Sequence, residues 1–188
     1  VFANAQTGNI VLLSQNIFEH NWNTALHYFI PLIFFALGVA AATIIRQSFQ
    51  NLQRFHWRQI VLVIEIVLLF IVGFIPGNFN LIANALVSFS CAMQVQSFRK
   101  VDNYAFASTM CIGNIRSGTE ALCNYFKNHN KQMLYKSLHY FGIIFLFALG
   151  SGIGSAMIVH FNLHTIWLSS LLLFIGFSIM FIEEEKSI

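Results

Sequence analysis

Long apolar runs recur along the chain and are separated by short polar segments. A helix that crosses a bilayer core needs about 20 mostly apolar residues. Five stretches reach or approach that length and are predicted to be transmembrane helices: His27–Ile45, Ile60–Ile75, Leu81–Phe98, Leu138–Val159 and Leu163–Ile182. Two more apolar stretches, Ala5–Phe18 and Tyr104–Phe126, carry a Gly-Asn pair in the middle, and we predict that neither crosses fully.

The composition supports a membrane protein and excludes several other classes. Of the 188 residues, 57% are hydrophobic and 9% charged, whereas about a quarter of the residues of a soluble domain are charged. The 21 Phe exclude a disordered chain, and three Cys exclude a disulfide-rich scaffold. A net charge of +3 without a basic stripe argues against nucleic-acid binding. The predicted main partner is therefore the lipid bilayer.

The ten Lys and Arg residues predict the topology. If only the five clear stretches cross, all ten lie on one side, in the 46–58 loop, the 99–136 region and the C-terminal tail. If the Gly-Asn stretches crossed too, the basic residues would divide between both sides. The positive-inside rule makes the basic side cytoplasmic. We therefore predict a multi-pass protein of the cytoplasmic membrane, with Trp22 and Trp167 at the outer boundary and Trp57 at the inner one.

An internal repeat organises these elements. Residues 27–38 and 139–150 share seven of twelve positions, beginning with His-Tyr-Phe and ending with Phe-Ala-Leu-Gly. Upstream, Gly8-Asn9-Ile10 matches Gly113-Asn114-Ile115, with a seven-residue difference that falls in the intervening loop. The repeated unit is therefore a helix, a Gly-Asn segment and two more helices.

Three spans per copy is an odd number, so the two copies should have opposite orientations in the membrane, as in many transporters. The predicted fold class is all-α: a polytopic helix bundle built as a 3+3 inverted-topology repeat with two broken or re-entrant Gly-Asn segments. Residues 1–188 form a single membrane domain, with repeat one at 1–78 and repeat two at 79–188. The first helix of repeat one would precede Val1, so we expect the beginning of the chain to be missing.

Three motifs resemble those of the YoaK-like family, a domain-of-unknown-function family of bacterial multi-pass membrane proteins: Asn4–Leu13, Ala92–Arg99 and Thr109–Leu122. The resemblance covers nearly the whole chain. It implies an additional N-terminal helix, commonly with an Asp, that this sequence lacks. The second motif copy departs from the family pattern, because Ile112 stands before Gly113-Asn114 in place of Thr. The family brings no established activity.

The Gly-Asn pairs are the first candidate binding site. Irregular backbone in a membrane survives only where it is buried in protein or lines a wet cavity. Gly8 and Gly113 are expected to break the helix, and Asn9 and Asn114 to cap the short helices that follow. Two such helix ends facing each other would suit an anion or a small polar solute. The alternative is that Gly and Asn serve only in helix packing.

Glu65 is the only acid within a clear span. It lies about 10 Å along the helix from Arg58, and an ionised carboxylate there should find a partner or take up a proton. Gln94 is expected at a similar depth on the next helix. The pair is a candidate site for a coupling proton or cation. The alternative is a carboxylate that reaches the inner surface, or one satisfied by Gln94 or Asn84.

Arg116 and Glu120 share a helix face at a spacing of four residues. They are a candidate gate pair on the inner side of the second Gly-Asn site, or an ordinary ion pair at the water boundary. The small-residue pairs Gly38-x-x-x-Ala42 and Gly150-x-x-x-Gly154 are expected to pack against neighbouring helices.

No metal site, cofactor site or catalytic constellation is expected. His160 and His164 lack a third ligand, and the three Cys have no metal-binding spacing. We predict a transporter or channel for a small solute or ion of unknown identity, with its site between the inverted copies. The alternative is a non-transporting structural or regulatory membrane protein, and a homo-oligomer is compatible with either.

Overall fold

The computed structural model describes residues 3–50, 56–101, 104–105 and 111–185. Val1 and Thr109 lie outside these ranges, as do Arg54 and Lys186, two of the ten basic residues. The side chains of Lys100 and of the acidic stretch Glu183–Glu185 are also not described.

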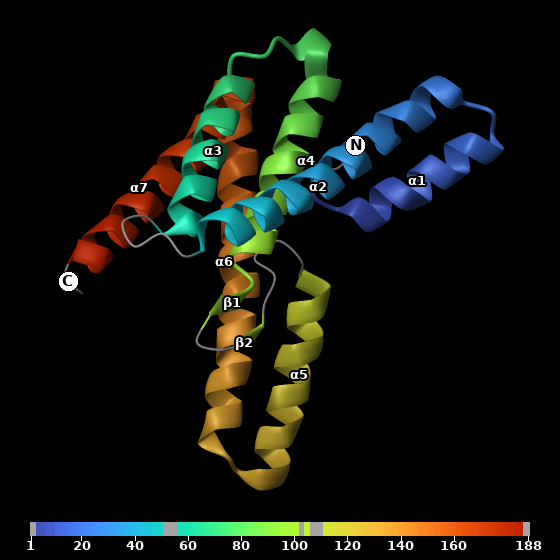
Figure 1. The fold of residues 1–188 in the computed structure, drawn as a ribbon. Coiled ribbons are helices and arrows are strands. Elements are labelled where there is room, and N and C mark those ends of the chain that lie inside the picture. Colours follow the sequence, from blue (N-terminus) through green and yellow to red (C-terminus); the bar gives the residue numbers. More distant parts are fainter. Residues whose placement is uncertain (1–2, 51–55, 102–103, 106–110, 186–188) are drawn as a thin grey trace. The chain divides into compact units, whose positions relative to one another are not determined.

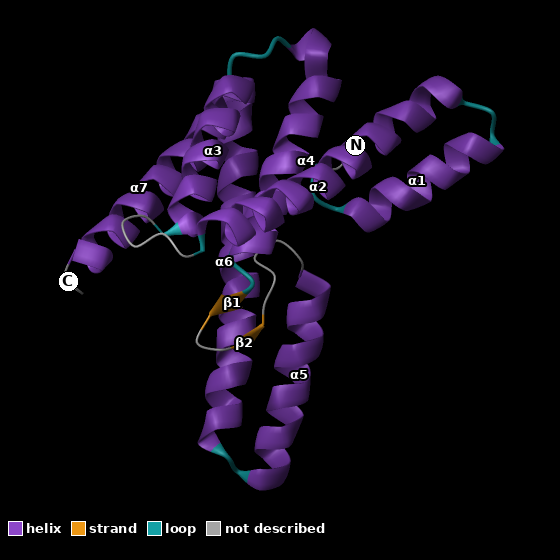
Figure 2. Ribbon diagram, in the orientation of Figure 1, coloured by secondary structure: helices purple, strands orange, loops and turns teal. Residues whose placement is uncertain are grey.

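The described chain is helical, which confirms the all-α prediction (Figures 1 and 2). A two-residue antiparallel pairing of β1 (Lys100–Val101) with β2 (Tyr104–Ala105) is the exception. The α-helices are α1 (Gln6–Phe18), α2 (Trp22–Phe49), α3 (Trp57–Val72), α4 (Asn80–Ser97), α5 (Cys111–Asn128), α6 (Lys131–Phe161) and α7 (Ile166–Glu185). Short 3-10 helices, η1 (Gly77–Phe79) and η2 (Asn162–Thr165), precede α4 and α7.

The Gly-Asn pairs do not break their helices, so that expectation is wrong. Gly8 lies within α1 and Gly113 within α5, and no described glycine has a positive φ. A glycine inside a helix costs only about 1 kcal/mol relative to alanine, which neighbouring turns and packing can offset. In each helix the Gly is third and the Asn fourth from the first described helical residue.

Contacts divide the chain into two compact units. The first unit comprises residues 1–97 and 161–188 and holds α1, α2, α3, α4 and α7. The second comprises residues 98–160 and holds the β1–β2 pair, α5 and nearly all of α6. These units reflect contacts, whereas the repeat halves at 1–78 and 79–188 reflect duplication of sequence, so the repeat boundaries stay a prediction.

Within the first unit, α2 and α4 run in the same direction and pack closely. Pro31 contacts Ser88 near one end, and Thr43 contacts Gln96 near the other. Between these points Gly38 lies against α4, where an added Cβ would collide with the Phe89 carbonyl oxygen and lie 2.8 Å from the Ala92 Cβ. The close approach of these two helices therefore requires glycine at position 38.

The helices α3 and α7 complete the first unit. Arg58 at the start of α3 donates from Nε to the Ser97 carbonyl at the end of α4 (3.2 Å), so α3 runs opposite to α4. At the other end of α3, Trp167 of α7 donates from Nε1 to the Phe70 carbonyl (3.2 Å). Gly73 lies under the same indole, which leaves no room for a Cβ. Trp167 therefore fixes the start of α7 against the end of α3.

In the second unit, α5 packs against the first half of α6. The Ser137 hydroxyl donates to the Gly118 carbonyl (2.9 Å), and a Cβ on Gly118 would lie 3.2 Å from that of Tyr140. His129 makes the turn between the helices with a φ of 51°. The two helices thus form a tight antiparallel hairpin (Figure 1).

Two helical stretches in the described residues are long and apolar enough to cross a membrane. They are Trp22–Phe49 and Lys131–Met180, with mean hydropathies of 2.3 and 2.1 in their most apolar windows. No residue of that window is buried in the second stretch. Phe145, Leu146 and Val159 are between 65% and 77% exposed. A soluble monomer rarely presents an apolar surface of this extent to water.

The two small-residue pairs behave differently. Gly38 and Ala42 pack against other helices as expected, and Ala42 belongs to a buried cluster with Trp57, Val61 and Met93. Cβ atoms built on Gly150 and Gly154 meet nothing within 4 Å among the described residues of the second unit, so the expected packing of this pair stays a prediction. A small-residue motif permits close approach but does not by itself provide a partner.

This contrast yields a matched pair of substitutions. We expect Gly38→Ala to destabilise the protein by about 1–3 kcal/mol, because the added methyl group is forced against α4 backbone. Gly150→Ala, at the equivalent repeat position, should leave stability unchanged or slightly raised. Thermal unfolding of both variants in the same detergent measures the difference. Equal losses would show that Gly150 is packed against another helix in the assembled protein.

Candidate functional site

Glu65 is held deep in the first unit by the geometry of α3. The helix begins with a capping box, in which the His56 side chain accepts from the Arg58 amide (3.2 Å) and Gln59 accepts from the His56 amide (3.2 Å). This cap sets the start of the helix and hence its rotation. Glu65, two turns further on, faces α4 and is 1% exposed.

Gln94 of α4 is the hydrogen-bonding partner of Glu65. With its amide nitrogen turned toward the carboxylate, Gln94 donates to Oε1 at 3.3 Å and to Oε2 at 2.5 Å. Cys91, a half-buried free thiol, lies one helical turn earlier on the same face of α4. The structure thus brings together the two residues that the sequence placed at similar depth.

No cation neutralises this carboxylate in the part of the chain that the structure describes. The nearest basic residue along α3 is Arg58, whose guanidinium lies against the Trp57 ring (5.4 Å to the ring centre) and bonds Ser97. Arg46 of α2 lies against the same ring at 5.8 Å. Both Arg side chains are therefore held at the end of the helices, and Glu65 forms no ion pair with a described Lys or Arg.

The first Gly-Asn motif takes part in a hydrogen-bond network that joins three helices. Asn9, which is fully buried, donates from Nδ2 to Gln6 Oε1 (3.0 Å), and Gln6 donates from Nε2 to the Ser88 hydroxyl (2.9 Å). Ser88 in turn donates to the Pro31 carbonyl (2.8 Å). The chain of bonds runs from α1 through α4 to α2, and Gly8 lies half-buried beside it. Sequence reasoning missed Gln6 and Ser88, although a polar residue inside an apolar run signals such a partner.

The second motif resembles the first in burial. Asn114 is 2% exposed, whereas Gly113 is exposed and a Cβ there would meet nothing within 4 Å. Asn9 and Asn114 thus each follow a glycine within a helix, and both are buried. The motifs belong to different compact units, so a joint site formed by Gly8, Asn9, Gly113 and Asn114 stays a prediction.

Arg116 and Glu120 are exposed on α5, four residues apart. Although a spacing of four residues would allow an ion pair, the two side chains form none in the described structure. Their role as a gate pair stays a prediction.

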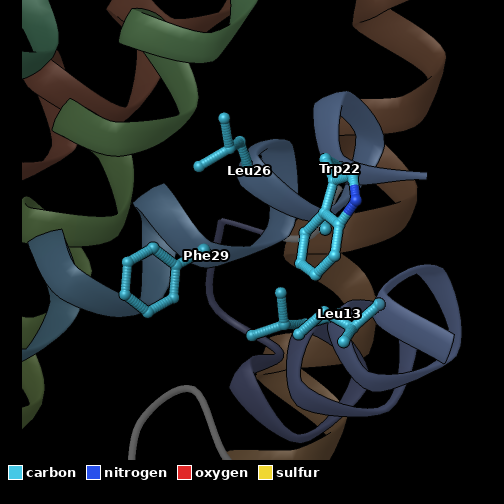
Figure 3. Close-up of a pocket in the computed structure, with 6 residues that line it drawn as sticks. Leu13, Trp22, Leu26 and Phe29 are labelled. Carbon is cyan, nitrogen blue, oxygen red and sulfur yellow. The ribbon is translucent and has the colours of Figure 1, made fainter. Parts of the chain in front are cut away.

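A cavity of about 390 Å³ lies between α1 and α2, near the turn that joins them (Figure 3). Its lining is apolar and consists of Leu13, Ile17, Trp22, Ala25, Leu26 and Phe29. A site for a polar solute needs polar groups that fix its orientation. This cavity has none, so it is not the polar site expected around Asn9 and Glu65.

Among the described residues, no group of three His, Cys, Asp or Glu side chains comes together to hold a metal ion. His164 instead stacks on Trp167, with ring centres 4.7 Å apart, and its Nδ1 lies 3.0 Å from the Gly73 carbonyl oxygen. This histidine therefore ties η2 to the end of α3.

Comparison with known proteins gives the family. The profile of a family described as "Protein of unknown function (DUF1275)" matches residues 1–179. The chain belongs to the DUF1275 family. This membership supports the family-level resemblance, while the narrower YoaK-like assignment stays a prediction. Neither a curated protein nor a solved structure matches the chain. DUF1275 membership therefore brings no activity with it, and function must be argued from the site.

The hydrogen-bond network gives a second testable prediction. Ser88→Ala removes the link from Gln6 to the Pro31 carbonyl and should destabilise the protein by about 1 kcal/mol, the usual scale for an interhelical bond in a membrane. Ser178→Ala is the control, because Ser178 bonds only the Phe174 carbonyl of its own helix among the interactions observed. Unfolding in detergent with a chemical denaturant compares the two. If the Ser88→Ala variant is as stable as the control, the network does not contribute measurably to the free energy of unfolding.

Proposed function

We propose that this DUF1275 chain is a multi-pass protein of the cytoplasmic membrane that transports a small solute or an ion, with Glu65 and Gln94 at the site of charge exchange. The membrane assignment is supported by the two long apolar stretches and by their exposed side chains. A bilayer is the solvent that such a surface requires.

The ends of the first unit favour one orientation in the bilayer. Arg46 and Arg58 gather around Trp57 at one end, where α4 also finishes at Ser97. Trp167 and His164 lie at the opposite end of α3. The positive-inside rule places the arginine end in the cytoplasm, and the tryptophans then occupy the two interfaces.

The buried Glu65 is the single observation that carries the transport proposal. An acidic side chain within an apolar helix is costly, and such residues in membrane proteins mark ion pathways and proton relays. Glu65 faces α4 in the interior of the first unit and contacts one amide, with no described cation beside it. A purely structural role would be met at lower cost by an apolar residue of similar size.

The repeat supports a site between the two copies. The Gly-Asn motifs lie within α1 and α5, and both Asn side chains are buried. With only 13 residues, α1 is about 20 Å long, too short to cross a bilayer core. Such short helices place their positive N-terminal ends within the membrane in transporters built from inverted repeats.

A second candidate function is that of a structural or regulatory membrane protein without transport. It is favoured by the network of Gln6, Asn9 and Ser88, in which the polar side chains bond one another. The apolar lining of the cavity between α1 and α2 points in the same direction. If the protein has this structural or regulatory function, the repeat serves only to build a stable helix bundle.

Reconstitution into liposomes distinguishes the two functions. The wild-type protein is expected to move at least one member of a panel that begins with protons and simple anions, followed by small polar solutes. Glu65→Gln keeps the size of the side chain but removes its charge, and we expect it to reduce transport to the rate of protein-free liposomes. Glu19→Gln, an exposed acid at the end of α1, should transport like wild type.

The outcome against transport is equally clear. If Glu65→Gln moves the same solute at the wild-type rate with the same pH dependence, Glu65 has no part in coupling. If the folded wild-type protein moves nothing from the panel, the structural alternative is preferred.

A further inference from the structure

We infer that the ligand of the Glu65–Gln94 pair is a proton rather than a metal cation, and that Gln94 satisfies both protonation states by reversing its amide. This inference rests on the proposed function for its biological purpose, since it names what that site exchanges. Proton binding itself is a property of the purified protein and can be measured without any transported solute.

The coordination available at Glu65 argues against a metal cation. Mg²⁺ takes about six oxygen ligands and Ca²⁺ about six to eight, part of which are usually waters. Glu65 supplies two carboxylate oxygens and Gln94 one amide oxygen, and at 1% exposure Glu65 has little access to water for the rest. Cys91 lies one helical turn before Gln94 on α4, and its thiol is a poor ligand for hard cations. A proton needs only one carboxylate oxygen and one acceptor, and the pair provides both.

The amide of Gln94 is suited to both states because its two ends have opposite hydrogen-bonding character and nearly the same shape. When Glu65 is ionised, the amide nitrogen donates to its oxygens, at 3.3 Å and 2.5 Å. When Glu65 carries a proton, its O–H donates to the amide oxygen after rotation of about 180° around the last side-chain bond. In each state the Gln94 amide therefore offers Glu65 a group of the matching hydrogen-bonding character.

Few other titratable groups face this pair. Cys91 on α4 is the neighbouring one, and the described side chains of α7, at 166–180, include no ionisable residue. The charges of Arg58 on α3 and Arg46 on α2 are held against Trp57 at the helix ends. The occupancy of the proton site is therefore set mainly by Glu65 and Gln94.

Labelling with dicyclohexylcarbodiimide tests the inference on the full chain in detergent. This apolar reagent adds a protonated carboxyl group across its C=N bond and is not attacked by a carboxylate without a proton. Mass spectrometry of peptides then gives the labelled fraction of Glu65 between pH 5 and 9. A one-proton site should lose label by about tenfold per pH unit once it is mostly ionised. Replacing N-methylglucamine by sodium, potassium or magnesium at equal ionic strength should leave that curve unchanged.

Two variants on α4 separate the role of Gln94 from a general effect on the helix. Gln94→Leu removes the amide. Because hydrogen bonds to an ionised carboxylate are stronger than those of the neutral acid, the labelling of Glu65 should persist to higher pH in this variant than in wild type. Gln96→Leu is the matched control, since Gln96 donates to Thr43 and not to Glu65. Its curve should superimpose on the wild-type curve, and thermal unfolding establishes that each variant is folded.

Three results would overturn the inference: Glu65 labelling that does not change with pH, protection of Glu65 by an added metal cation, or a folded Gln94→Leu variant with the wild-type curve. These results are independent of the transport assay. If labelling behaves as expected but no solute moves in liposomes, the proton site stands and the proposed function fails. If transport occurs but a cation protects Glu65, the proposed function stands and the proton assignment fails.

Discussion

Hydrogen bonds made by α4 are the interactions on which the first unit depends. In lipid the hydrophobic effect does not drive helices together, so close packing and polar contacts between helices must do so. One helix supplies most of these contacts: Ser88 connects to α1 and α2, Gln94 to α3, Gln96 to α2, and the Ser97 carbonyl to α3. Gly38 allows α2 to come close enough for these bonds to form.

The same constraint explains why Glu65 differs from the other buried polar groups. A hydroxyl or an amide can be fully satisfied by one or two neighbours, and its burial is then inexpensive. A carboxylate carries charge that a single neutral amide does not cancel. The contact with Gln94 provides hydrogen bonds for Glu65 but does not balance its charge. We therefore assign a proton to the Glu65 carboxylate.

Most of the helices could be predicted from the sequence, because a helix in an apolar environment needs a long run of apolar residues and such runs are easily recognised. The sequence also predicted that Gln94 lies beside Glu65. The short turn at 76–80 makes the two flanking helices antiparallel, so residues at similar distances from the turn lie at the same level. The glycine predictions were less successful. Gly8 and Gly113 were expected to break helices, but intact helices pass through both positions. The partners of Gln6 and Ser88 could not be predicted, because they depend on the rotation of each helix about its axis and not on its boundaries.

The length of α6 has a practical consequence. Its 31 residues extend for about 46 Å, while the hydrocarbon core of a bilayer is about 30 Å thick. Its first turns carry Lys131 and Lys136, so in the orientation proposed above the α5–α6 turn lies on the cytoplasmic side, outside the hydrocarbon core. The His129–Asn130 turn is thus a natural position for an inserted epitope or a fiducial-binding loop, by which a protein of this small size becomes visible to electron cryo-microscopy.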